Sequence, residues 1–259
     1  MLPAERRKLI LTLVESRRSV SVSELCQALD VSEMTIRRDL RLLSERGLVE
    51  RVHGGAVLRQ QHAAEPFQKP GYSTNDHRSA AVARKAASLV HEGCSLSLDV
   101  GPITFELARS VVGIPELTVV TAGLHITNVL TQASNIRVIV SGGVIQPGSM
   151  GMTGHIAMQA FRTFRVDKAF IEVEGLSTTH GITGSSHEDV LIKQAILEHA
   201  KQIVVLADSS QLGVSRLISI APLEAIDILV TDWGAPAEMV SEFEGRGVTV
   251  LIAEPEAAS

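Results

Sequence analysis

The sequence predicts two parts: a small N-terminal domain of three helices and two short strands, followed by an α/β domain with a mostly parallel sheet. Apolar residues recur at helical spacing within residues 1–59, and seven apolar runs alternate with amphipathic segments after residue 78. The chain has 259 residues, 45% of them hydrophobic and 20% charged, which suffices for a buried core in each part.

Three helices are expected in the small domain. Apolar residues at helical spacing predict the first helix over residues 4–16. Ser23 is the expected N-cap of a short second helix over residues 24–29. A third helix is expected over residues 33–46, and Gly47 should end it.

The third helix has two chemically different faces. Ile36, Leu40 and Leu43 lie at positions i, i+4 and i+7, so this stripe should pack inward. The other faces carry polar and cationic side chains, namely Thr35, Arg37, Arg38 and Arg41. A helix of this kind can place arginines against the bases or phosphates of a DNA major groove.

Residues 48–58 predict a two-stranded wing whose tight turn contains His53, Gly54 and Gly55. Together with the helices, it indicates a winged helix-turn-helix domain that binds double-stranded DNA. The residues expected to contact DNA are Ser32, Met34, Thr35, Arg37, Arg38, Arg41, Arg51 and His53. The alternative is a three-helix protein-interaction module whose arginines form a solvated face.

Charge is distributed unevenly along the chain. Residues 1–59 contain 11 Lys and Arg against 8 Asp and Glu, a net charge of +3, whereas residues 60–259 contain 13 against 21, a net charge of −8. This asymmetry indicates that residues 1–59 face DNA and that residues 60–259 repel it.

An interdomain linker is expected over residues 59–78, which are polar, contain two prolines and lack apolar periodicity. The predicted domains are therefore residues 1–58 and 79–259. In the second domain, strands are expected at residues 94–98, 117–121, 136–140, 168–173, 202–207, 227–231 and 248–252. Helices are expected between them at residues 79–92, 103–112, 123–133, 153–163, 187–200 and 235–246.

Polar and glycine-rich loops follow several of these strands, at residues 99–101, 141–143, 172–175 and 208–211. Because ligands bind beyond the carboxyl ends of the strands in such sheets, the loops are expected to surround one cleft. The alternative is ordinary turn chemistry, with Asp99 and Asp208 as helix caps.

Several motifs are long enough to compare with known families. The small domain contains SEMTIRRDLRLL and GLVERVHGGA, and the larger one contains DVGPITFELA, SGGVIQPGSMGMTGHIA, DKAFIEVEGL and ADSSQLG. In sequence and order, these motifs resemble the DeoR family of bacterial transcriptional regulators over nearly the whole chain.

The resemblance implies a repressor of a carbohydrate operon. Its α/β sensor domain would resemble ribose-phosphate isomerase and bind a sugar phosphate that relieves repression, although activation is also compatible with the sequence. The candidate effector-binding residues are Asp99, Gly101, Thr104, Gly123, Gly142, Gly143, Glu174, Gly175, Asp208 and Gln211.

The sensor motifs depart from the family pattern in ways that disfavour phosphate. The family usually has D-S-G-T-T-T where this chain has DVGPIT at residues 99–104, and Gln211 replaces a common lysine. Pro102 has no amide donor, and Glu172 and Glu174 stand where the family often has glycine and aspartate. These changes remove donors or add negative charge at a site for a dianion.

We therefore expect an effector without a phosphate, which is neutral, partly apolar or cationic. In the alternative, Arg78, His187 or His125 supplies the missing cation from another direction.

An enzyme is the main competing class, because the larger domain resembles an isomerase and contains Asp99, Glu172, Glu174, Asp208 and His187. Isomerisation of a sugar phosphate needs a base and a cation or amides that stabilise an enediolate. The common lysine is missing, so no catalytic residue is assigned. A DNA-binding protein without a ligand is the third possibility.

The composition predicts a cytoplasmic protein without a metal or cofactor. No apolar run approaches the roughly 18 residues of a membrane span. Cys26 and Cys94 lie far apart and show no metal-ligand spacing. A homodimer or tetramer is expected, because two heads can bind two half-sites on DNA.

Overall fold

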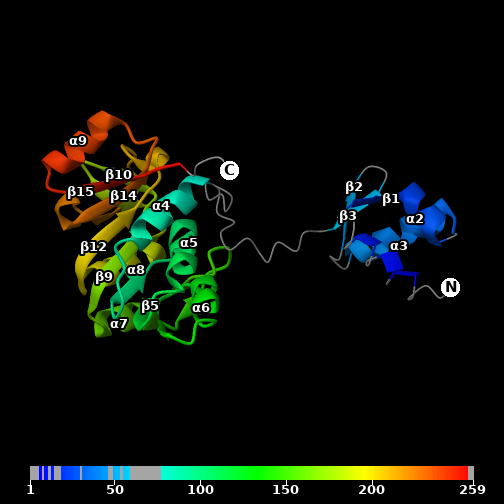
Figure 1. Ribbon diagram of the computed structural model, residues 1–259, viewed down its shortest axis with the longest axis horizontal. Helices are drawn as coiled ribbons and strands as arrows, with labels where there is room; N and C mark the ends of the chain where they lie inside the picture. The colour runs from blue at the N-terminus through cyan, green and yellow to red at the C-terminus, as the bar shows by residue number, and fades with distance from the viewer. Residues whose placement is uncertain are drawn as a thin grey trace. The chain divides into compact units, whose positions relative to one another are not determined.

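The computed structural model describes residues 6–7, 9–10, 13–14, 19–29, 31–45, 49–52, 55–58 and 77–255 (Figure 1). The chain divides into two compact units, a smaller one over Met1–Glu65 and a larger one over Pro66–Ser259. Each unit has its own apolar core.

The smaller unit contains helices packed against a three-stranded antiparallel sheet. The described residues between 6 and 14 are helical, as predicted. They are followed by β1 (Ser19–Ser21), α2 (Val22–Leu29), α3 (Glu33–Glu45), β2 (Val49–Val52) and β3 (Gly55–Leu58), and the sheet order is β1-β3-β2. The wing prediction is confirmed by the β2–β3 pairing, whereas β1 was not predicted.

The inward stripe of α3 is confirmed. Ile36, Leu40 and Leu43 are buried in the core of the smaller unit, with Ile10 and Leu25 among their neighbours in that core. Burying these side chains offsets part of the entropy lost when a short helix forms, since α3 alone would be marginal in water.

The predicted N-cap of α2 is wrong, because the helix begins at Val22 and Ser23 lies within its first turn. The Oγ atom of Ser21 accepts a hydrogen bond from the Glu24 amide at 3.1 Å, and the Glu24 carboxylate accepts one from the Ser21 amide at 2.7 Å. These reciprocal bonds form a capping box around Ser21 and Glu24.

Gly55 belongs to β3 and not to the turn in which it was expected. It pairs with Ser21 of β1 and Val52 of β2. A Cβ atom at position 55 would overlap the Val20 carbonyl oxygen, so the close approach of β1 requires glycine here. His53 and Gly54 lie outside the described residues.

A seven-stranded parallel sheet forms the centre of the larger unit and confirms the predicted α/β fold. Its order is β15-β14-β12-β9-β4-β5-β6. The strands are β4 (Ser95–Leu98), β5 (Leu117–Thr121), β6 (Ile136–Val140), β9 (Val166–Glu172), β12 (Ala200–Leu206), β14 (Ile228–Asp232) and β15 (Thr249–Ala253), which matches every predicted strand.

Helices cover both faces of this sheet. One core contains residues of α4 (His77–Ala87), α5 (Pro102–Val111) and α6 (Leu124–Leu130), and the other contains residues of α7 (His155–Thr163), α8 (His187–Leu197) and α9 (Ala237–Gly245). All six predicted helices are present. The first begins two residues earlier than expected, within the segment assigned to the linker, while residues 59–76 lie outside the described part of the chain.

Two smaller sheets were not predicted. One is the hairpin of β7 (Val144–Ile145) and β8 (Met152–Thr153), and the other is an antiparallel sheet of β10 (Gly175–Ser177), β11 (Gly181–Gly184) and β13 (Ile218–Ala221). These strands have two to four residues and lack the long apolar runs that mark the central sheet.

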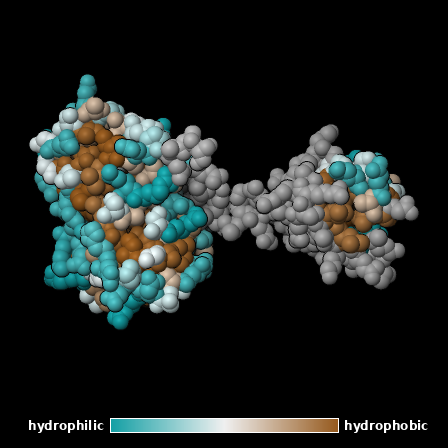
Figure 2. All heavy atoms as spheres, in the orientation of Figure 1, coloured by the Kyte–Doolittle hydropathy of each residue, from teal (hydrophilic) through white to brown (hydrophobic). Residues whose placement is uncertain are grey.

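The surface of the larger unit carries apolar patches between polar regions (Figure 2). Its exposed apolar side chains include Val140 at the end of the edge strand β6, Val144 and Ile145 of β7, and Ile156 of α7. None of the described helices is long and apolar enough to span a membrane.

Candidate functional site

The start of α3 is exposed and polar. The Ser32 carbonyl accepts hydrogen bonds from the amides of Thr35 and Ile36, and the Ser32 and Thr35 hydroxyls are 2.9 Å apart. Met34 is 81% exposed. Together with the exposed Arg38 on the next turn, these side chains form a surface that can enter a groove in DNA.

Arg37 and Arg41 are exposed as predicted. Arg37 pairs with Glu33 at 2.8 Å, one helical turn away. Such exposed pairs stabilise a helix by only about 0.3–0.5 kcal/mol, so DNA phosphate can compete for the guanidinium. Arg51 lies in β2, but its side chain is outside the described part of the structure, as is all of His53.

A cationic groove missed by sequence analysis lies beside α3. Its lining comes from the first helical segment and from α3, and consists of Arg6, Arg7, Met34, Thr35, Arg38, Asp39 and Leu42. Asp39 is buried and accepts a hydrogen bond from Arg6 Nε at 2.6 Å, and Arg7 Nε lies 3.8 Å from its other oxygen. Asp39 thus fixes the first helix against α3.

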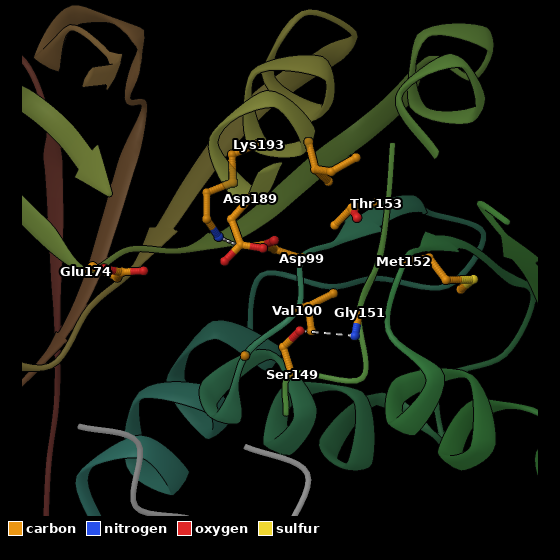
Figure 3. A pocket seen from close by; sticks show the side chains of 11 residues that line it. Asp99, Val100, Ser149, Gly151, Met152, Thr153, Glu174, Asp189 and Lys193 are labelled. Atoms are coloured by element: carbon orange, nitrogen blue, oxygen red, sulfur yellow. Dashed lines mark hydrogen bonds and ion pairs between the residues drawn. The ribbon is translucent and has the colours of Figure 1, made fainter. Parts of the chain in front are cut away.

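A pocket opens in the larger unit at the carboxyl end of β4 (Figure 3). It is lined by Asp99, Val100, Gly101, Ser149, Gly151, Met152, Thr153, Glu174, Asp189, Ile192 and Lys193. Three of the predicted effector residues, Asp99, Gly101 and Glu174, therefore lie in one pocket. Seven others do not line it.

Lys193 is the cationic side chain of the pocket, and it was not predicted from the sequence. It lies in the middle of α8, is buried, and donates hydrogen bonds to Asp99 Oδ2 and to the Glu172 carbonyl, the latter at 2.8 Å. In Figure 3 its ammonium group points towards Asp99, and Asp189 lies beside this pair. None of Arg78, His187 and His125, the three residues considered as replacements for the lysine at position 211, lines the pocket, and the cation there is Lys193.

Burial alone would lower the pKa of Lys193. The charges of Asp99 and Asp189, together with that of Glu172, outweigh this penalty and raise the pKa above its ordinary value. Lys193 is therefore a permanent cation across the physiological pH range.

Glu172 lies behind the pocket at the N-terminus of α5. Its Oε2 atom accepts hydrogen bonds from the amides of Ile103 at 2.8 Å and Thr104 at 3.3 Å. Burial raises the pKa of Glu172 to about 8, although Lys193 and the two amides oppose the shift. The expected position of Glu172 near the pocket is correct, but its carboxyl group faces α5.

Thr104 and Gly123 make hydrogen bonds within the loops and helix starts that follow β4 and β5. The Thr104 hydroxyl donates to the Gly101 carbonyl at 3.0 Å. Gly123 is the N-cap of α6, and its amide donates to the Thr121 hydroxyl at 3.0 Å. Neither residue lines the pocket.

The remaining glycines occupy turns and close contacts. Gly142 and Gly143 both have positive φ angles and lie between β6 and β7. Gly175 begins β10, packed against the Val214 carbonyl.

The helix-cap interpretation is correct for Asp208 and wrong for Asp99. Asp208 and Gln211 form a capping box around η1 (Ser209–Gln211). Asp99 instead accepts hydrogen bonds from Lys193 and from the Glu172 amide, and the N-cap of α5 is Gly101.

Comparison with known protein families covers both units. Residues 6–62 match the family described as a DeoR-like helix-turn-helix domain, and residues 74–233 match the DeoR C terminal sensor domain. The chain belongs to the DeoR family of transcriptional regulators. Bacterial transcriptional regulators are similar to this protein over almost the whole chain.

Three such relatives illustrate the similarity. The HTH-type transcriptional regulator GolR of Listeria innocua is 32% identical, with 98% of this chain and all of the relative covered. The HTH-type transcriptional repressor GlcR of Bacillus subtilis is 30% identical, with coverage of 99% and 98%. A putative aga operon transcriptional repressor of Escherichia coli O157:H7 is 28% identical, with coverage of 96% and 93%.

Among solved structures, ribose 5-phosphate isomerase A from Neisseria gonorrhoeae aligns with 54% of this chain and 54% of its own, at 15% identity and a TM-score of 0.39. A second ribose 5-phosphate isomerase, from Methanocaldococcus jannaschii, aligns with 54% and 55% at 17% identity and a TM-score of 0.40.

Proposed function

We propose that this DeoR-family regulator represses a carbohydrate catabolic operon and that a small molecule bound beside Asp99 and Lys193 releases it from DNA. The observation that carries the proposal is the pocket at the end of β4, which lies within the region matched to the sensor domain. The names of two relatives, GlcR and the aga operon repressor, support the repressor role.

Operator binding is assigned to α3 and the wing. Arg38 and Met34 lie on the exposed side of α3, while Arg6 and Arg7 extend the cationic surface. Effector binding would favour a state of the protein with lower affinity for the operator, which relieves repression.

A homodimer or tetramer is part of this proposal. Two heads can bind two half-sites, and the exposed apolar side chains at β6, β7 and α7 offer surface for contact between copies. Analytical ultracentrifugation of the full chain tests this; a monomer at the concentrations that bind DNA would contradict it.

Catalysis is not part of the proposed function. Lys193 could in principle stabilise an enediolate, but its hydrogen bonds to Asp99 and to the Glu172 carbonyl hold it in an ion pair. Measurable turnover of ribose or fructose phosphates by the full-length protein would overturn this assignment.

The test of the regulatory function is fluorescence anisotropy of the protein on its own upstream DNA at fixed salt. Sugar phosphates, their unphosphorylated counterparts, polyols and amines are then added in turn. We expect at least one compound to lower the anisotropy. If the protein binds that DNA and no class of compound releases it, the effector-controlled mechanism is wrong.

A further inference from the structure

A carboxyl group occupies the N-terminus of α5, directly behind the pocket. The amides at the start of a helix carry partial positive charge and form a ready site for an anion. In α5 these donors meet Glu172 Oε2, at 2.8 Å from the Ile103 nitrogen and 3.3 Å from the Thr104 nitrogen. The protein thus supplies its own acceptor where a ligand anion could bind.

The amide donors of residues 102–105, which follow the N-cap Gly101, are accounted for. Pro102 has no N–H group. The Ile103 and Thr104 amides donate to Glu172, and the Phe105 amide donates to the Gly101 carbonyl at 2.9 Å. No amide in the first turn of α5 is left for a phosphate oxygen.

The carboxyl group is also fixed in place. Only 2% of Glu172 is exposed, and a Cβ atom at Gly101 would overlap its Oε2 atom. The Glu172 backbone is held on both sides, since its amide donates to Asp99 Oδ2 at 3.1 Å and its carbonyl accepts from Lys193 at 2.8 Å. A ligand phosphate would have to displace a buried side chain that accepts two amide hydrogen bonds and whose backbone makes two more.

The rest of the pocket is rich in acceptors. Asp99 is paired with Lys193, whereas no side chain in the described part of the chain pairs with the half-buried Glu174 carboxylate. Asp189 adds a third carboxylate to the lining. Hydroxyl or ammonium groups suit these acceptors, and a phosphate dianion does not.

We propose that Glu172 is a specificity-determining residue, which closes the N-terminus of α5 to phosphate and selects an effector with hydroxyl or ammonium groups and no phosphate. This inference rests on the proposed function of the pocket as the effector site. The blocking role of Glu172 can nevertheless be tested without knowledge of the effector.

The experiment is calorimetric titration of the full-length protein with inorganic phosphate, together with amide NMR shifts of Ile103 and Thr104. Glu172→Gly removes the carboxyl group and exposes both amides. Glu172→Gln keeps an oxygen acceptor of the same reach, and Glu174→Gln removes a pocket charge without touching α5. We expect Glu172→Gly to bind phosphate roughly tenfold or more tightly than the unsubstituted protein, since two charge-assisted hydrogen bonds become available.

Neither glutamine variant should show phosphate-dependent shifts of the Ile103 and Thr104 amides, because Glu172→Gln keeps an acceptor beside them and Glu174→Gln leaves the Glu172 carboxyl group in place. If Glu172→Gly does not fold, as judged by circular dichroism, Glu172→Ser serves as the second opening variant because its shorter side chain leaves the amides accessible. Phosphate-dependent shifts of Ile103 and Thr104 in the unsubstituted protein would overturn the inference, as would a folded opening variant without any gain.

Failure of this inference is distinguishable from failure of the proposed function. If sugar phosphates release the unsubstituted protein from its DNA, the proposed regulatory function is supported but Glu172 does not exclude phosphate. If only unphosphorylated compounds release it and Glu172→Gly gains phosphate binding, both proposals are supported. If no compound releases it, the effector mechanism itself is wrong.

Discussion

The smaller and larger units of this regulator place their functional side chains in opposite ways. In the smaller unit, exposed side chains on one 13-residue helix, α3, form the proposed surface for DNA, and buried residues of the same helix hold it in place. In the larger unit, Lys193 meets Asp99 across 94 positions of sequence and both are buried. DNA affinity should therefore be separable from stability in the smaller unit, whereas effector binding and stability are coupled in the larger one.

The largest expected effect comes from Lys193→Met, which leaves Asp99 buried without its cation. Loss of one partner from a buried ion pair typically costs about 3–5 kcal/mol. The larger unit should therefore unfold at a much lower urea concentration. The matched control is Lys201→Met, because Lys201 makes a solvent-screened, exposed pair with Asp167 at 2.7 Å and its loss should change stability much less. Equal effects of the two variants would contradict the proposed coupling.

Glu172→Gln should change the pH dependence of stability in the larger unit. Burial raises the Glu172 pKa from 4.5 to about 8, so the folded state favours the protonated form. The unsubstituted protein should therefore lose stability relative to the variant as pH rises from 4.5 to 8, with little difference below that range. Thermal melts of both proteins across this range measure the difference; parallel pH profiles would show that Glu172 does not titrate in this way.

Arg38→Ala should weaken operator binding while leaving the smaller unit folded. A lost base contact would cost about 1–3 kcal/mol and relax sequence specificity. A lost phosphate contact would instead reduce the slope of log affinity against log salt by about one unit. Arg109→Ala is the control, because Arg109 is an exposed arginine of α5 that pairs with Glu106 in the larger unit. Unchanged affinity and an unchanged salt slope for Arg38→Ala would contradict the assignment of Arg38 to the DNA interface.

The smallest effect tests the capping box of α2. Ser21→Ala removes the side-chain acceptor of the Glu24 amide and should destabilise the smaller unit by about 1 kcal/mol. Ser23→Ala, at an exposed position within α2, should change stability by less than about 0.5 kcal/mol. Urea unfolding followed by circular dichroism compares the two variants; a larger loss for Ser23→Ala would restore the original N-cap assignment.

Much of the fold could be predicted from sequence because its elements are long or strongly periodic. The seven strands of the parallel sheet contribute side chains to apolar cores on both faces and are therefore rich in apolar residues. β10, β11 and β13 have three or four residues each, and the first two contain glycine, so neither length nor periodicity marked them. The capping box was detectable, since Glu24 follows Ser21 by three positions, but Ser23 stood closer to the apolar helix.

The candidate pocket was only partly predictable for a different reason. Asp99, Gly101 and Glu174 follow strands whose carboxyl ends meet at one edge of the sheet, so local sequence was sufficient. Lys193 comes from the middle of α8 and carries no local mark of a binding residue. The contact between Glu172 and the α5 amides depends on the placement of β9 beside β4, which spacing along the chain does not specify.

Gly101 and Glu172 also limit how the binding preference of this protein can evolve. Because the Glu172 carboxyl group fills the space beside Gly101, a Cβ atom at position 101 would overlap it unless the side chain at position 172 moved or became shorter. If both positions change, shortening the side chain at position 172 first avoids this overlap.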